Sequence, residues 1–340
     1  MRRLAIALAA WLALAAPAAA RPLVVILADA EGTETTDLIA PYAILAESGA
    51  VEVKVVAASA KLVRLMPGMA WVAPHMTLAE LARTRPEGPD VVIVPAMHRV
   101  SDPARAAWLR AQAHGGARVM SICDGALVLA GAGLLDGRRA TTHWNSHGPA
   151  ARKYPKVTWR RDSRWITDGS ITTTAGVSAS APASLALLAD LAGEGVMRDT
   201  ARRMGLPAPD PRHAGEDFRL NGAGIGVAAG NVLAFWRRDD VAVTLSPGFD
   251  ELSFATVLDG WSRTYRSTAW AVAASGVTSR RGLVVYGDKA RPARFDREAP
   301  LPGGGAMEAM FGQIRSAYGE PTARFVALQL EHPYGAVSAW

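Results

Sequence analysis

A single cysteine at a strand-to-helix junction constrains this chain more than any other feature. Residues 117–134 read Ala-Arg-Val-Met-Ser-Ile-Cys-Asp-Gly-Ala-Leu-Val-Leu-Ala-Gly-Ala-Gly-Leu. Residues 118–122 predict a short buried strand, and the Ala, Leu and Val residues after Gly125 predict a helix that begins at once. Because no residues are left for a loop, Cys123 must occupy a tight turn that presents its sulfur at the carboxyl end of the strand.

This layout is a nucleophile elbow with a thiol in place of a serine hydroxyl. Gly125 supplies backbone freedom and lets the helix pack close to the strand. The partial positive charge at the helix N-terminus lowers the pKa of a nearby thiol. A lone cysteine is more often a small buried hydrophobic residue, and that interpretation stays open. The strand–Cys–x–Gly–helix context favours a reactive thiol at Cys123.

The N-terminus predicts export. Of 340 residues, the first three are Met-Arg-Arg, an apolar run covers 4–16, and Pro17 and three alanines follow. This pattern predicts a signal peptide over 1–20, cleaved after Ala20. The apolar run is too short to span a bilayer, and no later stretch is long and apolar enough, although an uncleaved N-terminal anchor is an alternative. We expect a periplasmic or secreted protein without stable membrane insertion.

Export sharpens the question of the cysteine, because Cys123 is the only one in the chain. In an oxidising compartment an unpaired cysteine is used chemically or pairs with another molecule.

The formal net charge is +6, and cleavage after Ala20 leaves 35 basic and 31 acidic residues. The arginines are dispersed, which predicts a solvated surface and no nucleic-acid partner. Without a Walker loop, a dinucleotide fingerprint or clustered metal ligands, we expect no cofactor and no metal.

Strand and helix patterns alternate through the first half of the chain. Strands are expected at 23–28, 51–58, 90–94 and 118–122, with helices at 34–48 and 103–114. This alternation predicts an α/β fold with a doubly wound parallel sheet, whose site lies at the carboxyl ends of the strands. A short strand over 140–144 that contains His143, two short strands within 157–175 and a helix over 181–191 would complete a unit spanning 21–205.

The remainder of the chain predicts a second unit. Residues 206–230 begin with three prolines in the segment 206–211 and predict a stiff linker. Residues 231–340 predict a degenerate, partial repeat of the first unit, because Val-Ala-Ala-Ser occurs at 56–59 and again at 272–275. Chance similarity between two Ala-rich segments is the alternative. Residues 325–330 predict a last strand.

Three motifs carry a resemblance to a known family. They are Thr-Asp-Leu-Ile-Ala-Pro at 36–41, Ser-Ile-Cys-Asp-Gly-Ala at 121–126 with its continuation to Trp144, and Asp-Gly-Ser-Ile-Thr-Thr-Thr-Ala-Gly at 168–176. Together they resemble the ThiJ/PfpI superfamily, the cysteine branch of the class I glutamine amidotransferase-like fold, which is flavodoxin-like. The chain is most similar to the amidase-type domain of helix-turn-helix regulators and to isonitrile hydratases, without the DNA-binding part.

The resemblance implies catalytic roles for three residues. Cys123 would be the nucleophile, and Asp37 would approach the thiol and share a proton with it. His143 would act as a base or as a polar wall of the site. From the residues alone, Asp37 is equally well interpreted as a carboxylate at a helix N-terminus.

The resemblance also implies an oxyanion site or pocket around the thiol. The backbone N–H of Asp124 would donate to an oxyanion, next to Gly125. Where the family often has two glycines after the third strand, this chain has Ala96, Met97 and His98, which would narrow the pocket.

Two classes of function follow from these expectations. The first is a cysteine-dependent hydratase or amide hydrolase that acts on a small molecule. The second is a non-catalytic ligand-binding or redox-sensing protein of the same fold. A DNA-binding regulator is a weaker third option, suggested only by family neighbours. Because the second unit would cover a face that homologues bury on dimerising, we expect a monomer or a weak homodimer.

Overall fold

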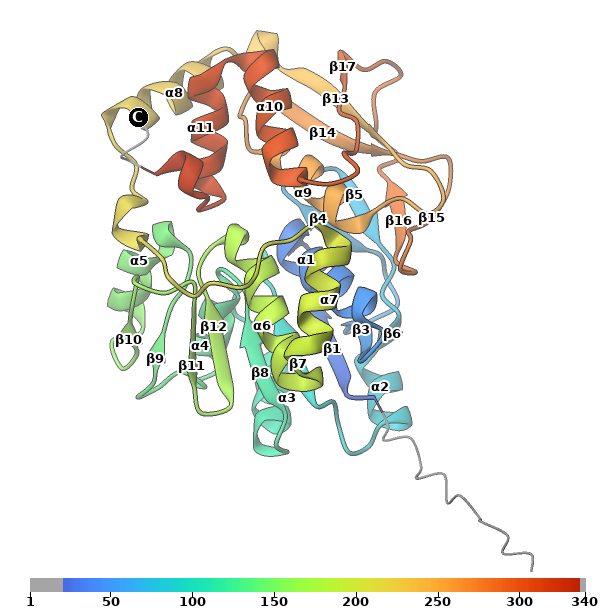
Figure 1. Ribbon diagram of the computed structural model, residues 1–340, viewed down its shortest axis with the longest axis vertical. Coiled ribbons are helices and arrows are strands. Elements are labelled where there is room, and N and C mark those ends of the chain that lie inside the picture. The colour runs from blue at the N-terminus through green and yellow to red at the C-terminus, as the bar shows by residue number, and fades with distance from the viewer. Residues whose placement is uncertain (1–20, 337–340) are drawn as a thin grey trace, which may run out of the picture.

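The computed structural model describes residues 21–336 (Figure 1), and the predicted signal peptide, residues 1–20, lies outside the described residues. Seven strands of the first unit form one sheet in the order β11-β12-β8-β7-β1-β3-β6. Neighbours pair in parallel except β11, which runs antiparallel to β12. The strands are β1 Leu23–Ala28, β3 Glu52–Ala57, β6 Met76–Thr77, β7 Val91–Val94, β8 Arg118–Ser121, β11 Trp165–Asp168 and β12 Ile171–Thr174.

Helices cover both faces of this sheet. On one face lie α1 Thr35–Ser48, α6 Ser180–Ala192 and α7 Glu194–Met204, and on the other lie α2 Leu78–Thr84, α3 Pro103–His114 and α4 Gly125–Gly131. Alternate residues of β1 divide between the two faces: Ile26 packs in the cluster of α1, and Leu27 packs in that of α3. The predicted doubly wound parallel sheet is confirmed, because the central strands β1 and β7 bury every side chain on both faces.

Three segments differ from the sequence expectations. The strand expected at 140–144 is only β9 Arg139–Ala140, paired with β10 Thr158–Trp159, so His143 lies beyond it, before α5 His147–Lys153. The predicted linker contains helix α8 Gly222–Leu233. The strand expected at 325–330 is wrong: these residues belong to helix α11 Glu320–Gln329 and its C-terminal cap. Short apolar runs fit either structure, and here Pro321 near the N-terminus and packing on α10 Ala306–Tyr318 favour a helix.

The second half contains another strand–helix–strand unit. Strands β13 Asp239–Thr244 and β14 Ser267–Val272 pair in parallel, and helix α9 Glu251–Ser262 connects them. Strand β17 Arg297–Glu298 pairs with β13 on its other side. Strand β13 and helix α9 each begin 216 positions after β1 and α1. The predicted repeat stays a prediction, and this order and spacing are what it requires.

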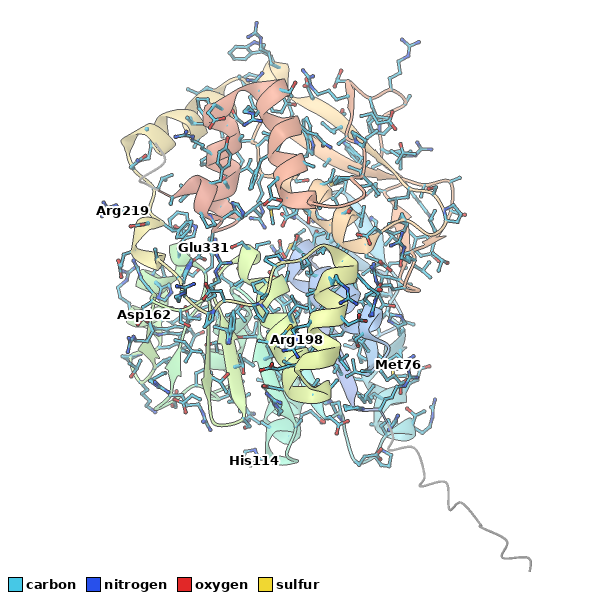
Figure 2. All side chains as sticks on the ribbon, in the orientation of Figure 1. Met76, His114, Asp162, Arg198, Arg219 and Glu331 are labelled. Carbon is cyan, nitrogen blue, oxygen red and sulfur yellow. The ribbon has the colours of Figure 1, made fainter. Side chains whose placement is uncertain are left out.

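The two halves pack into one body. A five-stranded sheet has the order β15-β16-β5-β4-β2 and draws strands from both halves. In it β16 Val284–Gly287 pairs antiparallel with β5 Ala70–Val72, and the other members are β2 Thr33–Glu34, β4 Val63–Met66 and β15 Val277–Thr278. Helix α9 packs against α1. Side chains fill the region between the halves, and Glu331 lies there (Figure 2).

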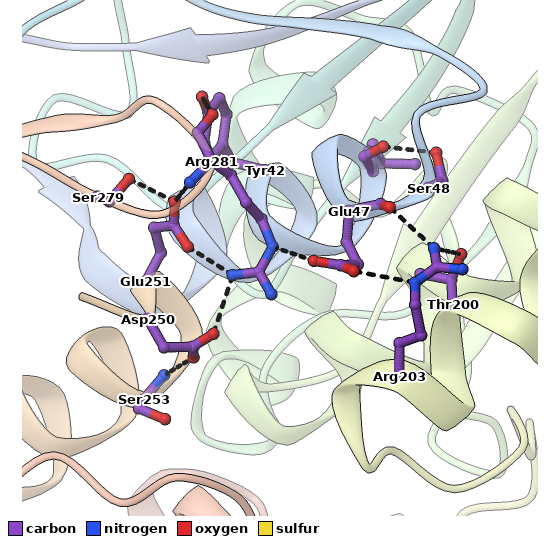
Figure 3. A network of polar contacts seen from close by, with 11 residues as sticks. Tyr42, Glu47, Ser48, Thr200, Arg203, Asp250, Glu251, Ser253, Ser279 and Arg281 are labelled. Carbon is purple, nitrogen blue, oxygen red and sulfur yellow. Dashed lines mark hydrogen bonds and ion pairs between the residues drawn. The ribbon is translucent and has the colours of Figure 1, made fainter. Parts of the chain in front are cut away.

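Hydrogen bonds at both ends show that α1 and α9 run antiparallel. Near the start of α1, Thr36 Oγ1 donates to Asp259 Oδ2 over 2.9 Å. Near its end, the guanidinium of Arg281 links Glu47 of α1, at 2.8 Å, to Glu251 of α9, at 2.5 Å (Figure 3). The N-terminus of α1 therefore faces the C-terminus of α9, next to the carboxyl edge of the main sheet.

Candidate active site

Cys123 lies on the tight turn that the sequence predicts. Strand β8 ends at Ser121, α4 begins at Gly125, and Cys123 has a φ of 54°. Its backbone N–H donates to Ala175 O at 3.2 Å and to Thr174 Oγ1 at 3.3 Å, which fastens the turn to the end of β12. A left-handed conformation in a residue other than glycine costs about 1–3 kcal/mol and persists only where the surroundings enforce it.

Gly125 allows this turn to pack closely. A Cβ at this position would lie 2.0 Å from Val94 O, at the end of the neighbouring strand β7. No side chain fits at that distance, so the predicted close approach of helix and strand requires glycine here.

The thiol of Cys123 is enclosed and holds its proton. The residue is 6% exposed. Burial raises its pKa well above the usual value, and the negative charges of Asp37, Asp124 and Glu34 raise it further, while the backbone N–H of Asp124 lowers it. The expectation of a lowered pKa at the helix N-terminus is therefore wrong, because desolvation and three acids outweigh one N–H.

Asp37 is fully buried in the first turn of α1. Its Oδ2 accepts from the backbone N–H of Ala96 at 3.1 Å, and its Oδ1 accepts from Ser180 Oγ at 3.5 Å. Burial raises the pKa of Asp37 to about 7, against the lowering effect of the Ala96 N–H. A carboxyl group with this pKa both gives and takes protons at neutral pH, which suits general acid–base catalysis.

Residues that sequence reasoning missed complete a buried cluster with Asp37. Arg263 Nη2 contacts Glu34 Oε1 at 2.8 Å, and Arg263 Nε contacts Asp259 Oδ1 at 2.5 Å. Glu34 Oε2 also accepts the backbone N–H of Asp37 at 2.5 Å. Two carboxyl groups thus contact one guanidinium, and the charge of that guanidinium also acts on Asp37. Burial, then the charges of Asp259 and Asp37, raise the pKa of Glu34 well above its usual value, against the effect of Arg263.

The opposite end of the same helix pair holds a second buried arginine, and there a carboxyl pKa shifts in the contrary direction. There the guanidinium of Arg281, 6% exposed, contacts Glu47, Asp250 and Glu251, while Arg203 also contacts Glu47 (Figure 3). Although burial opposes it, hydrogen bonds from Arg203 and Arg281 lower the pKa of Glu47. The arginines at this end thus lower the pKa of a carboxyl group, whereas at the Arg263 end burial raises the pKa values of Glu34 and Asp37 beside the thiol.

The residues expected to form the oxyanion site or pocket differ in their burial and in their hydrogen-bond partners. The N–H of Ala96 is bound to Asp37, so it does not point at an oxyanion. Met97 is buried and His98 is exposed. The carboxylate of Asp124 accepts from Thr142 Oγ1 at 3.0 Å and from Ser146 Oγ at 2.8 Å, which leaves its backbone N–H at the sulfur.

A C-terminal segment covers the loops on either side of Cys123. His143 Nε2 bonds to Gln329 O at 2.9 Å, so the ring contacts this segment. Glu331 is buried with a φ of 57°, and its Oε2 accepts from the N–H groups of Gly176 at 2.6 Å and Trp144 at 3.2 Å. Residues 329–331 therefore close the site over the end of β12 and the loop that carries His143.

The thiol of Cys123 does not line the cavity described next. A cavity of about 550 Å³ is lined by His147, Trp159, Arg161, His213 and neighbours, and Cys123 is not among its lining residues. Within residues 21–336, histidine, cysteine and acidic side chains form no group of three or more that could hold a metal ion.

The fold and site define an α/β protein with a cysteine elbow, and residues 23–190 match the DJ-1/PfpI family. The chain belongs to this family. Isonitrile hydratase of Pseudomonas putida is 33% identical over 184 residues, which are 51% of this chain and 74% of the relative. The HTH-type transcriptional regulator CdhR of Pseudomonas aeruginosa is 40% identical over 95 residues, 28% of each chain. The structure of Drosophila melanogaster DJ-1beta is 20% identical, covers 55% of this chain and 99% of its own, and has a TM-score of 0.49.

Proposed function

We propose that this protein is a cysteine-dependent hydratase that adds water to a small isonitrile, with hydrolysis of a small amide as the weaker variant. The observation that carries the proposal is the pKa of about 7 of Asp37, buried beside the thiol of Cys123 on a strained elbow. The relationship to an isonitrile hydratase supports the same class of substrate.

The expected reaction uses Asp37 as a proton relay. Protonated Asp37 gives its proton to the terminal carbon of R–N≡C, and Sγ of Cys123 bonds to the same carbon, forming the thioimidate R–N=CH–S–Cys. The thiol proton passes to Asp37. Water then adds across the C=N bond, its oxygen to the carbon and one of its protons to the nitrogen. The C–S bond breaks, the remaining hydroxyl proton passes to the sulfur, and the formamide R–NH–CHO is released.

The hydrogen bonding of Ala96 favours hydration over amide hydrolysis. Amide hydrolysis builds negative charge on an oxygen and needs donors aimed at it. Here the N–H of Ala96 is bound to Asp37, which leaves the N–H of Asp124 at the sulfur. Addition to an isonitrile requires instead a proton donor for carbon, and a carboxyl group with a pKa of about 7 is one.

The test is turnover of cyclohexyl isonitrile, followed by NMR detection of N-cyclohexylformamide. We expect formation by the wild type, none by Cys123→Ser, and a rate lowered by roughly 10²-fold or more by Asp37→Asn. Asp136→Asn, at an exposed pair with Lys156, is the matched control and should act as the wild type does. A wild type as inactive as Cys123→Ser on isonitriles, nitriles and amides would refute the proposal.

One observation favours the non-catalytic ligand-binding protein of the second class. Cys123 is 6% exposed and its pKa is raised, as in an inert thiol. A redox sensor needs an accessible thiol of low pKa, so sensing is the weaker member of this class. Sulfenic acid at Cys123 after dilute peroxide, trapped and located by mass spectrometry in a protein without turnover, would support it nonetheless.

We also propose export and a monomeric state. The support for export is the pattern of residues 1–20, and the support for a monomer is that α9 already covers α1 within the chain. A mature N-terminus at Arg21 in a periplasmic or secreted fraction would support export, and an N-terminus at Met1 would contradict it. Light scattering that gives a tight higher oligomer would contradict the monomer.

A further inference from the structure

Exposed apolar side chains concentrate in one segment that the site does not use. Eight large apolar side chains are exposed in the described chain, and six of them lie within residues 220–236, which we call the α8 surface. They are Leu220, Ile225, Val232, Leu233, Phe235 and Trp236. Phe235 and Trp236 are 73% and 71% exposed, and the segment contains no charged residue. Single exposed apolar residues need no explanation, but a contiguous group marks an interaction surface.

Helix α8 is attached to the body by one narrow stripe. Its buried residues are Gly224 and Asn231, seven positions apart, and Asn231 Nδ2 donates to Thr264 O at 2.9 Å and to Thr322 Oγ1 at 3.3 Å. Val227 and Ala228 are half-buried, and the other residues of the helix are exposed, at the edge of the molecule beside α11 (Figure 1). A surface helix ordinarily presents charged residues to water, so an uncharged outer face indicates a partner other than water.

Arginines stand at both ends of the α8 surface. Arg219 precedes it and lies at the periphery (Figure 2), and Arg237 and Arg238 follow Trp236 directly. All three are exposed, and no carboxylate within residues 21–336 forms an ion pair with them. Aromatic side chains next to basic ones at the end of an apolar helix are typical of segments that lie in a membrane interface.

The length of the helix favours lying on a bilayer over crossing it. Helix α8 has 12 residues, which corresponds to roughly 18 Å at 1.5 Å per residue, well short of a hydrocarbon core of about 30 Å. No helix within residues 21–336 is long and apolar enough to cross a membrane.

We propose that the α8 surface binds an anionic phospholipid bilayer, with Phe235 and Trp236 among the acyl chains and the arginines on the headgroup phosphates. This attachment would place the active-site half of the molecule at the membrane surface without inserting it. The proposal is independent of the reaction that Cys123 performs.

The test is co-sedimentation with vesicles of equal parts phosphatidylglycerol and phosphatidylethanolamine, compared with phosphatidylcholine vesicles. The protein is residues 21–340, which retain every described element and exclude the apolar run at 4–16. We expect binding to the anionic vesicles, weakened by about 0.5 M salt, and a loss of roughly tenfold or more in the Phe235→Ser/Trp236→Ser variant. Leu62→Ser, at an apolar residue exposed elsewhere, is the matched control and should bind as the wild type does.

Three results would overturn the proposal. The first is a wild type that sediments with neither vesicle. The second is a double variant that binds as tightly as the wild type while its thermal unfolding shows it folded. The third is light scattering that shows the wild type as a dimer and the double variant as a monomer, which would assign the α8 surface to a second copy of the chain.

Discussion

Replacement of Arg263 tests the charge assignment of the buried cluster. Arg263→Gln removes the cation that contacts Glu34 and Asp259 and whose charge acts on Asp37. Removing one partner of a buried ion pair costs about 3–5 kcal/mol, and we expect that loss in the free energy of unfolding near pH 8. Near pH 5 Glu34 and Asp37, whose pKa values burial raises, hold protons, so the loss should fall to about 1–2 kcal/mol, that of hydrogen bonds alone.

The assay is urea unfolding of the wild type and Arg263→Gln at both pH values, with Arg281→Gln as the matched control. Arg281 is also a buried cation at an end of the α1–α9 pair, but hydrogen bonds from Arg281 help to hold the pKa of Glu47 below its usual value. Because the pKa of Glu47 is moved away from the range between pH 5 and pH 8, the loss should be similar at both pH values. A loss in Arg263→Gln that does not change between pH 5 and pH 8 would refute the inference that the Arg263 cluster holds protons.

Three further predictions rest on single contacts. A carboxyl group whose pKa rises on folding destabilises the folded state as pH increases, here from the unfolded value near 4 to about 7. Asp37→Asn should therefore be more stable than the wild type near pH 8 and lose that advantage near pH 4, measured by thermal unfolding; an unchanged pH profile would contradict the raised pKa. Gly125→Ala should cost at least about 3 kcal/mol, because its Cβ would lie 2.0 Å from a carbonyl oxygen, whereas Gly226→Ala meets no atom within 4 Å and should stabilise by about 0.5–1 kcal/mol; equal stabilities in urea would refute the argument. Glu331→Ala should speed alkylation of Cys123 by about tenfold by loosening the covering segment, and an unchanged rate would show that the segment does not limit access.

Local patterns sufficed for the elbow and for the first helix. Cys123 stands between an apolar run and a helix-forming run with no spare residues, so only one backbone path was open. The helix predicted over 34–48 begins at Thr35, because Glu34 caps it by accepting the N–H of Asp37. The turn at Cys123 and the start of this helix both depend on residues within a few positions of each other, so the sequence pattern alone predicts them.

The electrostatics of the site could not be predicted from the sequence. Arg263 reaches Glu34 across a separation of 229 positions, through the packing of α9 on α1. No local pattern marks Arg263 as a site residue, since it looks like any arginine at the end of a helix. The lowered thiol pKa was wrongly expected for the same reason: the helix N-terminus is local, whereas the burial of Cys123 and its acidic neighbours comes from distant segments.

The packing of α1 against α9 within one chain has a consequence for how the site responds to dilution. A site assembled between two subunits falls apart below its dissociation constant, whereas a covalent tether holds both contributors at a fixed effective concentration. Glu34 and Arg263 therefore meet in every folded molecule, however few there are. The tether also frees the two ends of the helix pair from symmetry, so that one end can retain protons around Asp37 while the other is neutralised around Arg281.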